Sequence, residues 1–317
     1  SSDGTATRAA STACTGKHYV SNADNWYNIT DSSYEVPADS GDAEAGTLVF
    51  EEGDVDCLYA LDQLTAVTPA NLIIKSSYTG NIGLPKVNSD DTSYTYSEYR
   101  DTSFEIGAAA ASQTITCIIG EGNGSGSQRI NLDFGDCQAS ISVLKTGSRL
   151  ETGIPSCLIQ GTHASNTLSI TRGDVGVGFY PGDTSVIATL TVGWYTNPAT
   201  DSTVYVGSDV TLTNLKQSGG TVTLDCATTD RDCLGGSCNI VSGAHTAVEA
   251  SNGTVYYDSS GTLTTALVNA GGVLDFRRNQ NTPTVTNTTI NKGGSLYDTY
   301  ERVTFTNSVA TTGKLSD

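Results

Sequence analysis

Short runs in which hydrophobic and polar residues alternate follow one another along most of the chain from about residue 104. A period of two residues over four to six positions is typical of a β-strand with one buried face. No window in this part shows a convincing helical period. The runs that predict strands are QTITCII (113–119), RINLDF (129–134), ISVLK (141–145), NTLSI (166–170), ATLTV (188–192), STVYV (202–206), DVTLT (209–213) and TVTLD (221–225).

The part before residue 104 is less regular. TLVF at 47–50 and NLIIK at 71–75 predict two strands, whereas residues 1–45 are polar and turn-rich and indicate an N-terminal arm and an irregular cap. A tyrosine-rich excursion is predicted near 85–103. Its tyrosines form either a contact surface or a loop packed on its own rings; they are Tyr94, Tyr96 and Tyr99.

One unit recurs in the C-terminal third of the chain. It begins with a small residue and a glycine and continues as a strand, as in NGTVYYD at 252–258 and GGVLDFR at 271–277. Second strand signals lie between the copies, at GTLTTALVNA (261–270) and TPTVTNTTI (282–290). The recurring glycines, spaced by 16 to 22 residues, are Gly220, Gly236, Gly253, Gly272 and Gly294.

A period of about 20 residues with two or three strands predicts an all-β parallel β-helix over residues 46–317. One coil cannot bury its inner face alone, but stacked coils share a continuous core. Turns that need a positive φ require glycine or asparagine at regular intervals. The competing interpretation is a pair of β-sandwiches, which also has strands every 8–12 residues. A leucine-rich repeat is not supported, because its consensus is absent.

The cysteines permit two further predictions. Cys117, Cys137 and Cys157 are each separated by 20 residues, which predicts that they stack on one face of successive coils. The group Cys226, Cys233 and Cys238 has no histidine at a ligand-like spacing. It therefore indicates buried thiols or one local disulfide more than a metal site.

Composition narrows the class of protein. Hydrophobic residues make up 37% and charged residues 16% of the chain, and the net charge is −18. No stretch approaches the about 20 apolar residues of a membrane span. A negative balance of this size also argues against binding to double-stranded nucleic acid, which requires basic surface. The apolar and charged fractions are low because the chain is rich in residues that suit strands and turns, namely Thr, Ser, Gly and Asn.

The sequence offers carboxylates for glycoside hydrolysis, which needs two of them about 5–9.5 Å apart. In a chain with 34 acidic residues, neighbouring carboxylates also arise by composition, as turn caps or solvated positions. We therefore predict no catalytic residues. The candidates weighed are Asp133 with Asp136, Asp225 with Asp230 and Asp232, Asp275, and Asp298 with Glu301.

Other chemistry is weakly indicated. His18, His163 and His245 lie in no zinc-protease motif, and no serine-hydrolase elbow occurs. The acidic turn EEGDVD at 51–56 could bind calcium, but the EF-hand spacing is absent. The glycine-rich segment 120–126 lacks the lysine and the helix of a phosphate loop. No cofactor and no metal site are predicted.

Several phrases resemble uncharacterised Gly/Thr-rich parallel β-helix proteins of tailed-phage and prophage structural gene clusters. The resemblance spans most of the chain from about residue 20 and includes no catalytic motif. The phrases are NIGLPKVNSD (81–90), GEGNGSGSQRINLDFG (120–135), QGTHASNTLSITRGDVGV (160–177) and SGTLTTALVNAGGVLDF (260–276).

This resemblance implies a non-enzymatic virion component made in the host cytoplasm, a capsid decoration protein or a tail-fibre or spike-like appendage. We expect residues 1–45 to dock on capsid or tail proteins, and the chain to form a homotrimer, which would bury exposed coil faces. The acidic rod would serve particle stabilisation or attachment to a host surface. The alternatives are a polysaccharide-binding or polysaccharide-degrading tailspike, a hydrolase or lyase, and a bacterial adhesin or extracellular filament.

Overall fold

A computed structural model describes most of the chain from residue 46 onward, together with a short N-terminal hairpin. The described residues are 27–29, 32–34, 46–54, 56–57, 70–83, 104–106, 114–147, 153–193 and 202–312. Every element among them is a β-strand. The predicted tyrosine-rich excursion and most of the predicted arm lie outside these residues. The predicted boundary between residues 45 and 46 therefore stays a prediction.

The chain divides into two compact units, Ser1–His163 and Ala164–Asp317. In the first unit two parallel sheets alternate along the chain, one in the order β3-β4-β6-β8 and the other in the order β5-β7-β9. The hairpin pairs β1 (Tyr27–Asn28) with β2 (Ser33–Tyr34) in antiparallel fashion. The other strands of this unit are β3 (Thr47–Phe50), β4 (Asn71–Lys75), β5 (Phe104–Glu105), β6 (Thr114–Glu121), β7 (Ile130–Asp133), β8 (Gln138–Val143) and β9 (Cys157–Gln160).

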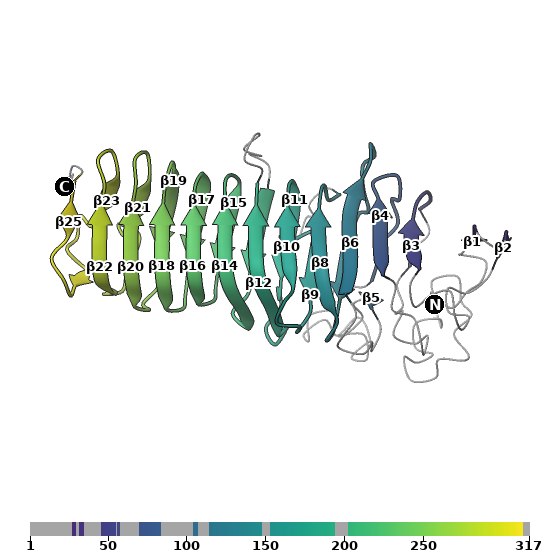
Figure 1. Cartoon of the computed structure of the whole chain (residues 1–317), viewed down its shortest axis with the longest axis horizontal. Helices are drawn as coiled ribbons and strands as arrows, with labels where there is room; N and C mark the ends of the chain where they lie inside the picture. Colours follow the sequence, from purple (N-terminus) through teal and green to yellow (C-terminus); the bar gives the residue numbers. More distant parts are fainter. Residues whose placement is uncertain are drawn as a thin grey trace. The chain divides into compact units, whose positions relative to one another are not determined.

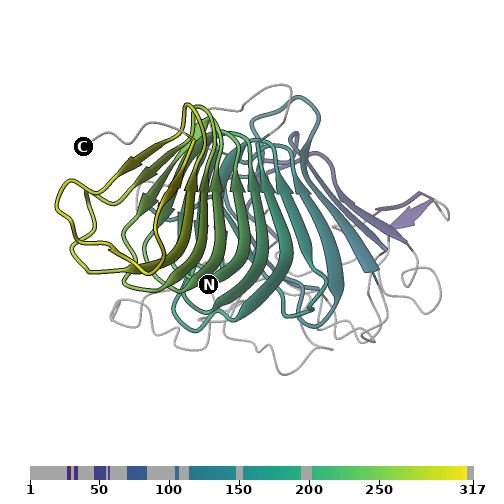
Figure 2. The same ribbon diagram turned by 60° about the vertical axis from the view of Figure 1, so that its left-hand side comes forward.

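The second unit repeats the same arrangement more regularly (Figures 1 and 2). Its first sheet contains β10 (Thr167–Ile170), β12 (Ser185–Val192), β14 (Val210–Gln217), β16 (Thr228–Cys233), β18 (His245–Ala250), β20 (Leu263–Val268), β22 (Thr284–Ile290), β24 (Thr304–Phe305) and β25 (Ala310–Thr311). Its second sheet contains β11 (Gly173–Val177), β13 (Ser202–Val206), β15 (Thr221–Leu224), β17 (Gly236–Ile240), β19 (Gly253–Tyr257), β21 (Val273–Asp275) and β23 (Ser295–Tyr297).

From β10 to β22, each strand of the second unit pairs in parallel with the strand two elements further along the chain, as β19 pairs with β21, and β25 also pairs with β22. Equivalent positions in neighbouring coils are 17 residues apart at Thr228 and His245, and 22 apart at Asn269 and Asn291. The predicted all-β parallel β-helix is therefore confirmed, with coil lengths close to those expected from the recurring glycines.

The core of the second unit is a column of apolar side chains. Alternation along each strand points every second residue inward, and the parallel register stacks these residues coil on coil. In the second sheet the innermost row is almost wholly inaccessible to solvent. It consists of Val204, Val222, Cys238, Val255, Leu274 and Leu296.

The recurring glycines stand at equivalent positions, immediately before or at the start of the strands of the second sheet, as predicted. Two of them show why a side chain is excluded. Gly236 has φ +79°, and an added Cβ would lie 2.4 Å from the backbone oxygen of Gly220. At Gly272 the Cβ would lie 2.0 Å from the backbone oxygen of Ala250. The coils therefore approach one another too closely at this corner for any residue larger than glycine.

Polar side chains also stack from coil to coil at the end of the first sheet. Asn269 Nδ2 donates to Glu249 Oε1 at 2.8 Å, and Asn291 Nδ2 donates to Asn269 Oδ1 at 2.7 Å. Thr312 Oγ1 extends the series by donating to Asn291 Oδ1 at 3.1 Å. Because each amide both donates and accepts along the stack, the ladder favours one register of the coils.

Candidate functional site

The outward side of the second sheet in the second unit carries one continuous row of aromatic and polar side chains. The register places one residue of this row in each coil, so that neighbours are about 4.8 Å apart. The row consists of Tyr205, Thr223, Asn239, Tyr256, Asp275 and Tyr297. Together with Asp225, Asp258, Arg277 and Arg278 we call it the Tyr–Arg face.

Alternation within each strand determines which residues reach this face. In β19, Val255 and Tyr257 are buried, and Tyr256 between them is only partly buried. In β13, Val204 and Val206 are buried on either side of Tyr205. The tyrosine rings of the row therefore lie outside the core, on the solvent side of the sheet.

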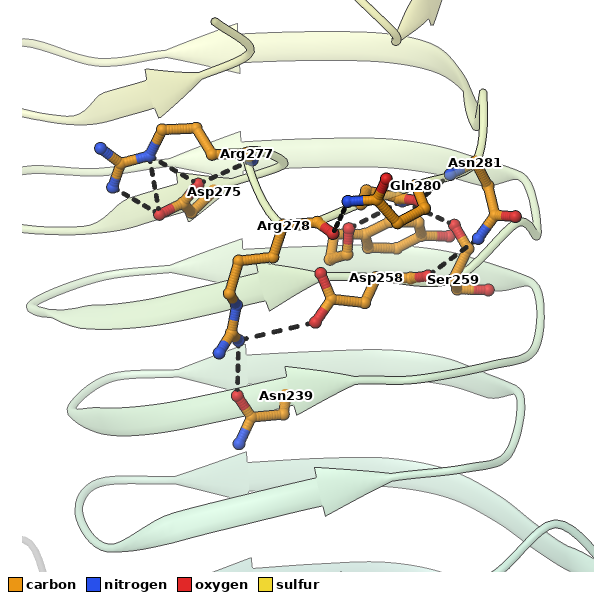
Figure 3. Close-up of polar contacts among 10 residues, drawn as sticks. Asn239, Asp258, Ser259, Asp275, Arg277, Arg278, Gln280 and Asn281 are labelled. Atoms are coloured by element: carbon orange, nitrogen blue, oxygen red, sulfur yellow. Dashed lines mark hydrogen bonds and ion pairs between the residues drawn. The ribbon is translucent and has the colours of Figure 1, made fainter. Parts of the chain in front are cut away.

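Arg278 lies over one of these rings. Its guanidinium carbon is 3.7 Å from the centroid of the Tyr256 ring, which is a cation–π stack. Arg278 Nη2 donates to Asn239 Oδ1 at 2.8 Å and lies 3.6 Å from Asp258 Oδ2 (Figure 3). Half of its side-chain surface is still exposed. The guanidinium thus spans three coils of the face while presenting part of its surface to solvent.

Arg277 forms a second stack one step along the face. Its guanidinium carbon is 4.3 Å from the centroid of the Tyr297 ring. Its Nη2 donates to Asp275 Oδ2 at 2.7 Å and its Nε to Oδ1 at 3.0 Å, which makes a bidentate pair (Figure 3). Asp275 is buried beneath the arginine, and burial alone would raise its pKa, but the hydrogen bonds and charge of Arg277 outweigh this effect and lower that pKa.

A buried anchor holds these arginines in place. Asn279 is fully buried, and its Nδ2 donates to the carbonyls of Tyr257 at 2.8 Å and Ser259 at 2.9 Å. Phe276 is also buried, and its backbone N–H donates to the carbonyl of Tyr297. Because both ends of the short segment 276–279 are fixed in the core, the two arginines between them project outward.

The far end of the face has an aromatic cluster of its own. Tyr205 donates its hydroxyl to Asp225 Oδ2 at 3.2 Å, and the Phe179 ring stands edge-on to the Tyr205 ring with centroids 5.4 Å apart. Partial burial and the charge of Asp225 raise the pKa of Tyr205. The pKa of Asp258, at the centre of the face, is also raised, chiefly by burial and despite the charge of Arg278.

The carboxylates that the sequence offered for glycoside hydrolysis lie on different parts of the structure. Asp225 and Asp275 belong to the Tyr–Arg face, whereas Asp230 and Asp232 lie on β16 of the first sheet. Burial and the charges of Asp230 and Glu249 raise the pKa of Asp232. The candidate group Asp225, Asp230 and Asp232 is thus divided between the two sheets.

Among the remaining candidates, Asp133 and Asp298 cap turns, and Asp136 bonds to a neighbouring coil. Asp133 Oδ1 accepts from the Gly135 N–H at 2.8 Å, and Asp136 Oδ1 accepts from the Thr162 hydroxyl at 2.6 Å. Asp298 accepts the backbone N–H groups of Arg302 and Val303 at 3.0 and 3.1 Å. Glu301 is exposed and has φ +51°, in the same turn.

The predicted stacking of Cys117, Cys137 and Cys157 is wrong. Cys117 lies on β6 of one sheet, Cys157 on β9 of the other, and Cys137 directly before β8. The spacing of 20 residues therefore does not correspond to one coil in the first unit, where Thr114 pairs with Gln138 and Ile130 with Cys157. All three thiols are nevertheless buried.

The described cysteines are free thiols in the core, as the sequence interpretation allowed. Burial raises the pKa of Cys57, Cys226 and Cys233 to about 12. Among the described residues, no cluster of three or more His, Cys, Asp or Glu side chains is arranged to hold a metal ion. In the acidic turn 51–56, Glu51 pairs with Lys75 and Asp56 Oδ1 accepts from the Asn81 N–H.

One buried polar cluster was not predicted. His245 and Arg231 both lie inside the second unit, each with at most 1% of its surface exposed. His245 Nε2 donates to the Ser242 carbonyl at 3.0 Å, so Nδ1 is the acceptor for the Thr228 hydroxyl at 2.8 Å and for Arg231 Nη2 at 3.3 Å. Burial and the nearby Arg231 charge lower the pKa of His245 to about 4.

The Tyr–Arg face was also missed from the sequence. A signal for it was present, because five members of the row stand three residues after a recurring glycine; they are Thr223, Asn239, Tyr256, Asp275 and Tyr297. The repeat therefore aligns these positions although the coil length varies. The sequence does not show that Arg277 and Arg278, which follow the strand, fold back over the rings of Tyr297 and Tyr256.

Comparison with known protein families, with curated proteins and with solved structures found no match. The described ranges contain no helix with the length and apolar character needed to cross a membrane.

Proposed function

We propose that this protein is a non-enzymatic structural component of a phage-like particle, a capsid decoration protein or a tail-fibre or spike-like appendage. One observation carries the proposal. In the second unit both sheets continue coil after coil in parallel register, from β10 to β24 and from β11 to β23, without a helix or an inserted domain among the described residues.

Such a stack is mechanically suited to a projecting role. Each coil contacts only its neighbours, and its backbone N–H and C=O groups are paired on both sides. The apolar column and the Glu249–Asn269–Asn291 ladder stabilise the same register. A stack of this kind resists bending and leaves little free backbone for proteases.

The particle setting comes from the resemblance to proteins of phage structural gene clusters. The net charge of −18 supports a solvated, projecting surface that repels other acidic macromolecules. In this proposal residues 1–45 dock on capsid or tail proteins, the chain assembles as a homotrimer, and the mature protein lies on the virion surface after synthesis in the host cytoplasm.

The test is to purify particles from the source and to locate the chain by immunogold microscopy. We expect label on particles, and we expect that a chain lacking residues 1–45 folds but no longer binds to particles stripped of the native protein. Circular dichroism of the shortened chain provides the folding control. Label confined to the host envelope would refute the particle role and favour the adhesin alternative. Unchanged binding by the shortened chain would refute the docking role of the arm.

A further inference from the structure

We propose that the Tyr–Arg face is a binding surface for an uncharged polysaccharide, whose chain runs along the stack of coils. This inference is independent of the structural role proposed above, because a β-helix can bind a glycan with or without attachment to a particle. It rests on the side chains that the register collects on one side of the second sheet.

The first argument is chemical. Sugar recognition requires fixed hydrogen-bond donors and acceptors for hydroxyl groups, together with planar groups against which the C–H face of a pyranose can pack. The face supplies the Arg278 guanidinium as donor and the Asp258 carboxylate as acceptor, and Asn239 can do both. Planar surface comes from the guanidinium groups of Arg278 and Arg277, which stack on the Tyr256 and Tyr297 rings and are about half exposed, and from the ring of Tyr205 in the same row.

The second argument is preorganisation. Arg278 is held against the Tyr256 ring and by Asn239 and Asp258 before any ligand arrives, and the segment that carries it is anchored by buried Asn279. Less side-chain entropy is therefore lost when a ligand binds than would be lost by free arginines. With half of its surface exposed, the guanidinium can still reach a ligand hydroxyl.

The third argument is geometric. Successive members of the row are separated by one strand spacing, about 4.8 Å, so the five steps from Tyr205 to Tyr297 span about 24 Å. The length of one hexose unit along an extended polysaccharide is similar to the spacing between neighbouring coils. A polysaccharide parallel to the stack can therefore present an equivalent group to each coil in turn.

The fourth argument is electrostatic and selects the class of glycan. Asp225, Asp258 and Asp275 accompany the two arginines on the face, and the chain as a whole carries a charge of −18. Long-range repulsion therefore opposes polyanions. Hydrogen bonds to hydroxyl groups are not opposed by this repulsion. The charge of the protein therefore favours an uncharged polysaccharide as the ligand.

The experiment is affinity electrophoresis of the full chain in native gels that contain dextran, mannan or galactomannan, with polygalacturonate as the anionic comparison. We expect at least one uncharged polysaccharide to slow migration, with little change between about 50 mM and about 500 mM salt. We expect Tyr256→Ala and Arg278→Met each to weaken the dissociation constant about fivefold to tenfold, as expected for the loss of one or two hydrogen bonds or a ring contact.

Two further variants make the result interpretable. Thr264→Ala changes an exposed residue of β20, on the other sheet, and should leave binding unchanged. Tyr256→Phe keeps the ring and the arginine stack and should retain most of the affinity. Circular dichroism and thermal unfolding establish that each variant is folded. The proposal is overturned by the absence of retardation with all three uncharged polysaccharides, by tighter binding to polygalacturonate, or by folded Tyr256→Ala and Arg278→Met variants that bind as well as the natural chain.

Discussion

Arg231 provides the sharpest test of the energetics of the core. Its guanidinium is fully buried, and Nε and Nη1 have no hydrogen-bond partner among the residues that the structure describes. Nη2 alone makes a contact, with His245 Nδ1 at 3.3 Å. The residue paired with it in the preceding coil is Leu215, which shows that this position accommodates an apolar side chain. We predict that Arg231→Met stabilises the protein.

The magnitude follows from what the substitution removes. Each of the two buried unpaired nitrogens destabilises the folded state by about 1–3 kcal/mol, whereas the hydrogen bond that is lost contributes about 1 kcal/mol. Replacement of buried charged groups by apolar residues of similar volume has stabilised other proteins by about 1–4 kcal/mol. We therefore expect an increase in that range, with a melting temperature higher by about 2–4 °C for each kcal/mol.

The assay is thermal and urea unfolding followed by circular dichroism at pH 7. Leu215→Met, in the same row of the preceding coil, is the matched control and should change stability by less than about 1.5 kcal/mol. A folded Arg231→Met variant that is less stable than the natural chain by more than about 1 kcal/mol would refute the reasoning. Such a result would mean that the guanidinium has a favourable partner in the core.

Three further predictions concern a buried histidine, a corner glycine and the thiols. Because the pKa of His245 is lowered from 6.5 to about 4, its contribution to stability should be complete above pH 6.5 and lost as the pH falls towards 4, by an amount on the order of 3 kcal/mol. Urea midpoints against pH for the natural chain and for His245→Gln measure it, and equal slopes would contradict it. Gly272→Ala should destabilise by about 3 kcal/mol or more, because its Cβ would lie 2.0 Å from the Ala250 oxygen; an unchanged melting temperature would disprove the close approach. The seven described cysteines should react with a thiol reagent at pH 8 only after unfolding, as peptide mapping would show, and rapid native labelling of any of them would exclude the buried state.

Most of the fold could be predicted from local pattern. TLVF and NLIIK become β3 and β4 with the predicted bounds, and the recurring glycines stand at equivalent positions at the starts of the second-sheet strands. These signals are local. Alternation predicts which residues are buried, and a recurring glycine predicts where the backbone has no room for a Cβ. Both predictions hold in the folded protein because neither depends on the register of distant strands.

Predictions that needed a register were less successful. Equal spacing placed three cysteines on one face, but coil lengths differ in the first unit, and the cysteines lie on different elements. The group Asp225, Asp230 and Asp232 is close in sequence, yet a corner between β15 and β16 separates it. Coil lengths differ because the turns differ, so equal spacing along the chain does not give the pairing register, and a one-residue slip in that register moves the side chains of a strand to the opposite face.

The amino-acid sequence by itself determined that this protein is a stack of short parallel strands with a narrow apolar core and a strongly acidic, polar surface. The tertiary structure decided which residues meet. Arg278 covers Tyr256 and reaches Asn239, 39 residues away, and Arg231 lies in the core with two nitrogens that have no hydrogen-bond partner among the described residues. The physical reason is that burial and turn propensity act over a few residues, whereas neighbours on a coil surface depend on the length of every turn between them.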